Sequence, residues 1–278
     1  MDITDAYFET ATGPEFLDYF VQNGFVVARG LFDATHIQSI ETDIREGYAA
    51  LKADYTAQAG ADTVPPVLGM SKRLLKKLKG SDAYDSLMQQ PRFLDTIERF
   101  IGPDIMVYNN CDLFINDPVD TNPATLKTLH QETWTGLAVH EIVTWIPLHA
   151  PEKGNTITVV PKSHLYGMMP NRNRNLLPIE GFEPEPVIPV WHLQRGDVLF
   201  FHPLLLHGTS GRSTLRFSLG FAFKNAYMEA SSINTPWGYT GLRQGPMTRV
   251  RTILGNDLLT PLRTYGGKTS NAQQYEQP

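Results

Sequence analysis

Two histidines and a glutamate, divided between two distant parts of the chain, restrict the possible folds most strongly. His130 and Glu132 are two positions apart, so on a strand both side chains would point to the same face. His207 follows His130 by 77 positions and would therefore come from a different strand. A structural zinc site usually takes its ligands from two close pairs. The long interval instead favours a metal site built within a β core.

The chemistry of these three residues indicates which metal they would hold. Two imidazoles and one carboxylate form the facial triad that binds non-haem Fe(II) and leaves coordination positions open. We therefore predict that His130, Glu132 and His207 are the iron ligands and form the catalytic centre. Arg216 follows His207 by nine positions. An arginine there can hold a carboxylate through two parallel hydrogen bonds.

Each of these assignments has a rival nearby in the sequence. His202 could replace His207, but it precedes a proline within a continuous apolar stretch. Arg212 could replace Arg216, but it lies in a Gly-Arg-Ser turn, whereas Arg216 enters a predicted strand and can point inward. If Glu132 does not bind the metal, the alternative carboxylates are Asp112 and Glu141.

The order of secondary structure along the chain predicts the fold class. Apolar residues at helical spacing predict helical support over about residues 14–101, and strands separated by Gly, Pro and Asn turns predict a β core over about 105–225. The predicted strands are Phe25–Gly30, Ile105–Ile115, Ala138–Leu148, Thr156–Val160, Val187–Pro189, Val198–Phe201 and Leu215–Phe223. We therefore expect a mainly β protein with flanking helices, in which N-terminal helices buttress a jelly roll.

The rest of the chain and its bulk properties complete this prediction. Residues 226–278 show no clear period and are expected to form a tail or lid over the site, within one domain spanning 1–278. A net charge of −5 argues against nucleic-acid binding. No apolar run approaches the ~18 residues of a membrane helix, and the N-terminus lacks a signal-peptide pattern. The single cysteine, Cys111, fits a reducing, cytoplasmic setting. The oligomeric state is not indicated.

A series of short motifs accompanies the triad in a fixed order. They are Gly24-Phe25-Val26-Val27, Leu129-His130-Gln131-Glu132, Thr144-Trp145-Ile146-Pro147-Leu148, Gly154-Asn155, Val160-Pro161-Lys162-Ser163-His164, Gly196-Asp197-Val198-Leu199-Phe200-Phe201, His207-Gly208-Thr209 and Arg216. Over roughly residues 15–225 the chain thereby resembles the phytanoyl-CoA dioxygenase (PhyH) family of Fe(II)/2-oxoglutarate oxygenases. The resemblance implies a cupin-like double-stranded β-helix. It also implies a site for Fe(II), 2-oxoglutarate and O2.

The resemblance also implies roles for individual residues. Arg216 would grip the far carboxylate of 2-oxoglutarate, with Thr209 as a hydroxyl partner and Trp145 packing nearby. The family usually has an aspartate where this chain has Glu132, and Lys162 stands in the place of a glycine. In related halogenases a small residue replaces the triad carboxylate and frees a position for chloride. A carboxylate at position 132 therefore favours hydroxylation over halogenation.

These implications lead to an expected function with two alternatives. We expect a dioxygenase that hydroxylates a small polar metabolite or biosynthetic intermediate while converting 2-oxoglutarate to succinate. The same iron site could instead serve desaturation, ring closure or epimerisation. A non-catalytic metal-binding β-barrel is the second alternative.

Several polar side chains are candidates for contact with the substrate. On the segment before the triad, these are Tyr108, Asn110 and Asp112. The loop over residues 171–175 and the tail arginines Arg243, Arg249 and Arg251 could add to the wall. The basic helix predicted over residues 71–79 either meets an anionic ligand or presents a solvated face.

Overall fold

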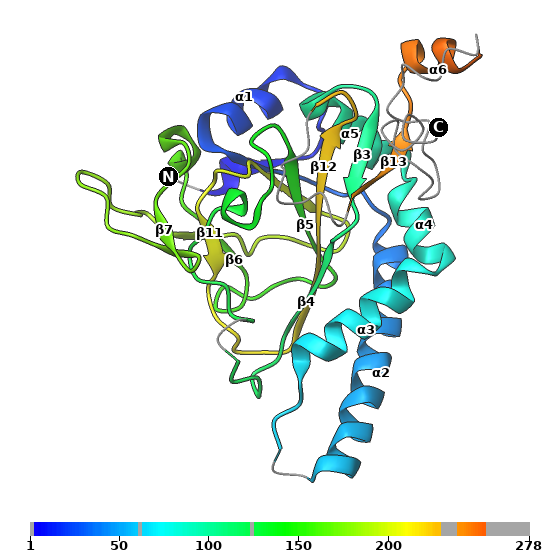
Figure 1. The fold of residues 1–278 in the computed structure, drawn as a ribbon, viewed down its shortest axis with the longest axis vertical. Coiled ribbons are helices and arrows are strands. Elements are labelled where there is room, and N and C mark those ends of the chain that lie inside the picture. Colours follow the sequence, from blue (N-terminus) through cyan, green and yellow to red (C-terminus); the bar gives the residue numbers. More distant parts are fainter. Residues whose placement is uncertain (1–2, 61–62, 123–124, 229–237, 254–278) are drawn as a thin grey trace, which may run out of the picture.

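The computed structural model combines a β core with helices along one side of it (Figure 1). The structure describes residues 3–60, 63–122, 125–228 and 238–253. Within them, the helices are η1 (Ile3–Ala6), α1 (Pro14–Asn23), α2 (Ala34–Ala59), α3 (Val67–Lys79), α4 (Asp82–Met88), α5 (Pro91–Ile101), η2 (Glu132–Thr135), η3 (Ser163–Tyr166) and α6 (Pro246–Ile253).

The strands form one large sheet and two small ones. The large sheet has the order β1 (Tyr7–Phe8), β2 (Phe25–Ala28), β10 (Val198–Phe201), β5 (Ile142–Pro147), β12 (Arg216–Asn225), β3 (Ile105–Tyr108) and β13 (Tyr239–Arg243), and β4 (Asp112–Asn116) also pairs with β12. A second sheet has the order β11 (His207–Thr209), β6 (Ile157–Val159) and β9 (Ile188–Pro189). A hairpin joins β7 (Asn171–Arg172) and β8 (Asn175–Leu176).

Alternation along the strands of the large sheet separates two apolar layers. Phe217, Leu219, Phe221 and Phe223 of β12 point to the outer face, where they join the helices in one core. On the inner face, residues such as Val143 and Trp145 of β5 and Leu199 and Phe201 of β10 pack with Ile157 and Val159 of the second sheet. This second layer holds the two sheets together, as the predicted double-stranded β-helix requires.

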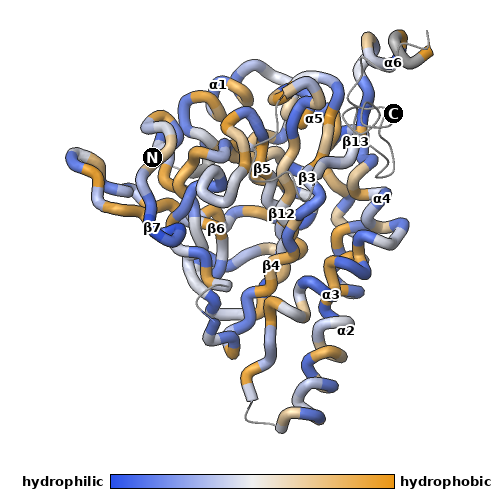
Figure 2. Tube along the Cα trace, in the orientation of Figure 1, coloured by the Kyte–Doolittle hydropathy of each residue, from blue (hydrophilic) through white to orange (hydrophobic). Residues whose placement is uncertain are grey.

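The helices begin and end where local chemistry dictates. Asp33 caps α2 because its carboxylate accepts hydrogen bonds from the amides of Thr35 and His36. Gly24 ends α1 in the left-handed conformation, with φ of 82°, which a glycine adopts without strain. α2 and α3 lie side by side against the sheet (Figure 1). Both alternate hydrophobic and hydrophilic residues along their length (Figure 2).

The structure corrects several predicted boundaries. The single strand expected over Ile105–Ile115 is divided into β3 and β4 by residues 109–111. α4 was not predicted as a separate helix. In the tail, which showed no period, β13 pairs with β3 and α6 follows it. The rest of the tail, residues 229–237 and 254–278, lies outside the described residues. No helix in the described ranges combines the length and the apolar character that crossing a bilayer requires.

Candidate active site

The two histidines of the predicted triad are joined through their main chains. The amide nitrogens of His130 and His207 each donate to the carbonyl oxygen of the other residue, at 2.9 and 3.0 Å. This pairing places the two imidazole rings 4.2 Å apart, centroid to centroid. β11 supplies His207, as expected for a residue arriving from a second strand.

Glu132 completes this group from the first residue of η2. Its Oε1 lies 3.2 Å from Nε2 of His207 and 3.6 Å from Nε2 of His130. The three side chains each offer one ligand atom within 4.8 Å of the others. The alternative carboxylates of Asp112 and Glu141 do not belong to this group.

The prediction that His130 and Glu132 share a strand is wrong, because the chain turns into a 3-10 helix at Glu132. Gln131 between them is still extended, with φ of −110° and ψ of 144°. Its fully buried amide donates to the carbonyls of Gly167 at 2.9 Å and Leu204 at 2.6 Å, and accepts from the amide of Met169 at 2.8 Å. These bonds fix the turn, so the carboxylate reaches the histidines without strand alternation.

The carbonyl contacts of the imidazoles engage Nδ1 of each ring and leave Nε2 facing the Glu132 carboxylate. Nδ1 of His130 lies 2.7 Å from the carbonyl oxygen of Thr128, and Nδ1 of His207 lies 3.0 Å from that of Leu205. A carbonyl only accepts, so each Nδ1 carries a proton and each Nε2 of the neutral ring has a free lone pair. Such second contacts orient histidine ligands in metal sites.

The charges of the triad fit a cation. Burial opposes ionisation of Glu132, but its contacts with His130 and His207 outweigh burial and hold its pKa well below the usual range. Burial, and then the neighbouring His130, lower the pKa of His207. The contacts with the imidazoles lower the pKa of Glu132 through protons on Nε2 of the rings. Without those protons, the ionised carboxylate faces two lone pairs at short distance. Protons or a metal ion between them would relieve this repulsion, and the imidazole and carboxylate donors suit Fe(II).

A buried arginine without a counterion among the described residues lies on the inner face of the large sheet. Arg216 is 2% exposed, and its Nε and Nη1 have no hydrogen-bond partner among the described residues. Its guanidinium carbon lies 5.2 Å from the ring centroid of Trp145. Burial lowers the pKa of Arg216 to about 9. A buried charge without a partner is costly, so this position suits an anionic ligand.

A second unpaired group on β12 was missed in the sequence. Ser218 is fully buried, and its Oγ has no hydrogen-bond partner in the described structure. It follows Arg216 by two positions on the same strand, so both side chains point to the inner face. The only sequence signal for Ser218 was its spacing of two positions from Arg216. Serines at such a spacing also occur in many strands that bind no ligand.

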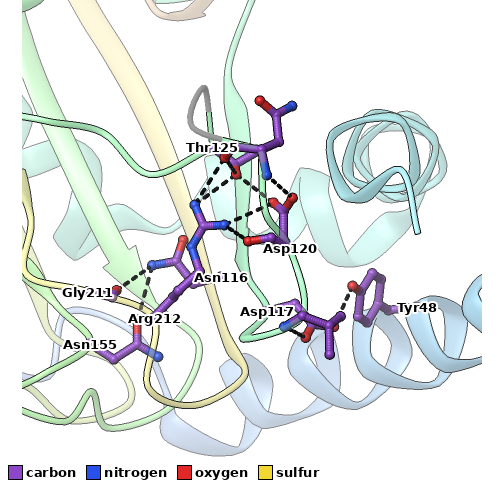
Figure 3. A network of polar contacts seen from close by, with 10 residues as sticks. Tyr48, Asn116, Asp117, Asp120, Thr125, Asn155, Gly211 and Arg212 are labelled. Carbon is purple, nitrogen blue, oxygen red and sulfur yellow. Dashed lines mark hydrogen bonds and ion pairs between the residues drawn. The ribbon is translucent and has the colours of Figure 1, made fainter. Parts of the chain in front are cut away.

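Arg212, the rival of Arg216, is engaged elsewhere (Figure 3). It donates to the main-chain oxygen of Asp120 and, at 2.9 Å, to Oγ1 of Thr125, and it forms an ion pair with Asp120 at 3.5 Å. These contacts fasten the loop after β4 to the turn before β12. His202, the rival of His207, lies next to His164, and burial lowers its pKa to about 4.

The candidate substrate residues are divided between the inner face and the rim. Asp112 shares a strand face with Phe114, opposite the outward Leu113 and Ile115. Asp112 is exposed. Desolvation of the carboxyl group by its surroundings still raises its pKa, the charge of Glu132 adds to this effect, and Lys127, Lys72 and Arg174 oppose it. Asp112 is therefore within electrostatic reach of the triad.

Tyr108, the second candidate, packs against Tyr239 with ring centroids 5.2 Å apart. Asn110 is exposed in the segment that divides β3 from β4. Thr209 ends β11 and, together with Lys153 and Thr158, lines a hollow of about 420 Å³ that none of the triad residues lines.

The tail arginines have other partners or lie elsewhere. Arg243 forms ion pairs with Asp95 at 2.7 Å and Glu98 at 2.9 Å, both on α5. Arg249 lines a separate hollow of about 400 Å³ with Arg243. The side chain of Arg251 lies outside the described residues. The predicted loop over residues 171–175 is the β7–β8 hairpin.

Comparison with known proteins gives consistent matches. Residues 20–217 match the family model described as Phytanoyl-CoA dioxygenase (PhyH). The protein named "Phytanoyl-CoA dioxygenase, peroxisomal" from Rattus norvegicus is 24% identical over 232 residues, covering 70% of this chain and 62% of that protein. The protein of the same name from Homo sapiens is 22% identical over 217 residues, covering 72% and 64%. The chain therefore spans less than two thirds of the length of these relatives.

Solved structures share the fold at low sequence identity. The non-haem monooxygenase ThoJ has a TM-score of 0.59 at 18% identity, covering 82% of this chain and 83% of that one. The epimerase SnoN, solved with Fe3+, alpha ketoglutarate and nogalamycin RO, has a TM-score of 0.57 at 18% identity, covering 82% and 92%. The alpha ketoglutarate dependent carbocyclase SnoK has a TM-score of 0.53 at 16% identity, covering 88% and 92%. These matches confirm the jelly-roll core.

Proposed function

Because the chain belongs to the phytanoyl-CoA dioxygenase family, we propose that it is an Fe(II)- and 2-oxoglutarate-dependent dioxygenase acting on a small molecule. The observation that carries this proposal is the convergence of His130, Glu132 and His207, whose ligand atoms lie within 4.8 Å of one another. These three residues would hold the iron. With 2-oxoglutarate and O2 bound, the iron would supply the oxidising power for hydrogen abstraction from a substrate.

Arg216 would bind the far carboxylate of 2-oxoglutarate. Its unpaired Nε and Nη1 and the unpaired Oγ of Ser218 lie on one inner face and together match the acceptors of a carboxylate. Trp145 packs beside the guanidinium. Thr209 is the further hydroxyl candidate, since it follows His207 by two positions on β11.

The substrate would be a small polar molecule that meets Tyr108, Asn110 and Asp112. Asp112 supports this proposal most directly, because its carboxylate has no ion pair or hydrogen bond in the described structure and is within electrostatic reach of Glu132. A long acyl chain would bury this carboxylate without a partner, at a cost. We also propose a reducing, cytoplasmic setting, supported by the single buried cysteine, Cys111.

Hydroxylation is the outcome that we propose, because Glu132 occupies the position that a halide would need. Epimerisation and ring closure are the runner-up outcomes, since SnoN and SnoK share the fold with this chain. Hydrogen abstraction is common to all of them. A non-catalytic metal-binding protein is the remaining alternative, and it leaves the buried Arg216 without a ligand.

The test combines metal binding with turnover in matched variants of the triad. Anaerobic titration should give one Fe(II) per chain, and His130→Ala or His207→Ala should abolish binding. Glu132→Gln keeps the length but removes the charge, so 2-oxoglutarate turnover should fall steeply while the melting temperature is kept. Glu132→Asp should retain part of the activity. Full Fe(II) binding in both histidine variants, or wild-type turnover in Glu132→Gln, would contradict the assignment.

A further inference from the structure

The two oxygens of the Glu132 carboxylate have different surroundings. Oε1 faces the imidazoles of His130 and His207. Oε2 is turned the other way and accepts a hydrogen bond from Oγ1 of Thr135 at 3.1 Å. A carboxylate whose oxygens were both free could bind a metal through either oxygen or through both.

Thr135 lies one turn after Glu132, on the same short helix η2. Residues three apart are aligned along a 3-10 helix, so the two side chains meet. The Thr135 hydroxyl also lies 2.8 Å from the main-chain oxygen of Glu132. The single proton of this hydroxyl is therefore shared between two acceptors that both belong to Glu132, the main-chain oxygen and Oε2.

We propose that Thr135 is a positioning residue that makes Glu132 a one-oxygen ligand. By holding Oε2, the hydroxyl keeps the second oxygen away from the metal and directs Oε1 to the position between the histidines. A carboxylate that bound through both oxygens would occupy one of the positions that 2-oxoglutarate and O2 need. This inference rests on the proposed function and adds a role for a residue outside the triad.

The long side chain of Glu132 makes such a contact necessary. Glutamate has one more rotatable bond than aspartate, so an unrestrained glutamate loses more conformational entropy when it binds a metal. A hydrogen bond already present in the metal-free protein reduces that loss. Residues that orient metal ligands typically contribute 10–100-fold to metal affinity.

Thr133 on the same helix provides a matched control. It is buried, and its Oγ1 has no hydrogen-bond partner among the described residues. Replacing either threonine by valine keeps the shape and removes one hydroxyl. The two variants therefore differ in whether the lost hydroxyl contacts Glu132.

The experiment is an anaerobic Mn(II) titration of the full chain, followed by electron paramagnetic resonance. Thr135→Val should weaken Mn(II) binding by about 10–100-fold, Thr135→Ser should restore it, and Thr133→Val should leave it unchanged. In Glu132→Asp the carboxylate is drawn back by one methylene and no longer reaches the hydroxyl. Adding Thr135→Val to that variant should then have no further effect.

Two results would overturn the inference. One is wild-type Mn(II) affinity in Thr135→Val. The other is an equal loss of affinity when Thr135→Val is made in the wild-type chain and in the Glu132→Asp variant, which would indicate a role in folding alone. Failure of the wild-type chain to bind Mn(II) or Fe(II) would instead contradict the proposed function. Normal binding by the wild type together with an unaffected Thr135→Val would contradict the positioning role alone.

Discussion

At the scale of single residues, Arg216 has opposite effects on stability and on ligand binding. Its buried guanidinium lacks hydrogen-bond partners at Nε and Nη1 in the part of the chain that the structure describes, and an unpaired buried charge destabilises the ligand-free protein. Arg216→Met should therefore raise the melting temperature of the metal-free chain. The same change should weaken 2-oxoglutarate binding by about 2–5 kcal/mol, the range for removing one partner of a buried charge pair. Calorimetric titration of the Mn(II)-loaded protein and thermal melts measure both effects.

Arg212 is the control for this prediction. It contacts Asp120 and Thr125 in the described structure, so Arg212→Met should lower the melting temperature and leave 2-oxoglutarate affinity nearly unchanged. If Arg216→Met lowered stability and left 2-oxoglutarate affinity intact, the assignment of the cosubstrate arginine would be wrong.

The residues of the site differ in how far the sequence could predict them. His130, Glu132, His207 and Arg216 combine uncommon residue types with a characteristic interval, so a pattern selects them as candidates before a structure exists. Ser218 and Thr135 are hydroxyl residues, which are frequent in any chain. Only their burial and contacts distinguish them, and both properties depend on tertiary packing. No pattern in the local sequence identifies Ser218 or Thr135 as part of the candidate site.

At the scale of elements, Asp117 fastens the long helix α2 to the end of β4. Its carboxylate accepts hydrogen bonds from the Tyr48 hydroxyl at 2.8 Å and from the Lys52 ammonium at 2.9 Å (Figure 3 shows the Tyr48 contact). Burial opposes ionisation, but the Val119 amide, Lys52 and Tyr48 outweigh it and lower the pKa of Asp117 below its ordinary value of 3.8. Asp117→Asn should therefore cost about 1.5–3 kcal/mol at pH 7, as for hydrogen bonds to a charged group.

The sign of the pH dependence follows from this lowered pKa. A carboxyl group with a depressed folded-state pKa contributes stability above its unfolded pKa, and this contribution is lost as the pH falls through the folded value. The difference in urea unfolding free energy between wild type and Asp117→Asn should thus be full at pH 7 and shrink below about pH 3.8. Asp18→Asn on α1, whose side chain has no hydrogen bond or ion pair in the described structure, is the control. A constant difference across pH would contradict the prediction.

Elements were predicted well where a local pattern decides them. Val198–Phe201 was predicted with the observed bounds. The division between β3 and β4 was missed although Asn109 and Asn110 interrupt the apolar residues there, because two polar residues alone do not show that pairing with β12 changes to a new register. η2 was missed because the turn at Glu132 is held by contacts of Gln131 with residues distant in sequence. Long-range hydrogen bonds of this kind produce no periodic pattern in the amino-acid sequence.

At the scale of the whole molecule, the triad is built beside the second sheet and not beside the long helices α2 and α3. His207 belongs to the second sheet. Glu132 is the first residue of η2, and the main-chain amide of Glu132 donates to the carbonyl oxygen of Pro203 at 2.9 Å. The long helices α2 and α3 pack on the opposite, outer face of the large sheet. A ligand that binds only the folded site stabilises the elements whose opening would release it.

Metal binding should therefore protect the two faces of the molecule unequally. Addition of Mn(II) and 2-oxoglutarate should slow amide hydrogen exchange most in residues 128–136 and 203–210, where local opening separates the ligands. Exchange in α2 should slow only as far as it proceeds through global unfolding, since α2 supplies no ligand to the triad. His207→Ala is the control, because it keeps the fold but should remove the protection. Mass spectrometry of peptides from both regions measures the contrast, and equal protection of α2 and of residues 203–210 would show that the site is coupled to the whole fold rather than to the second sheet.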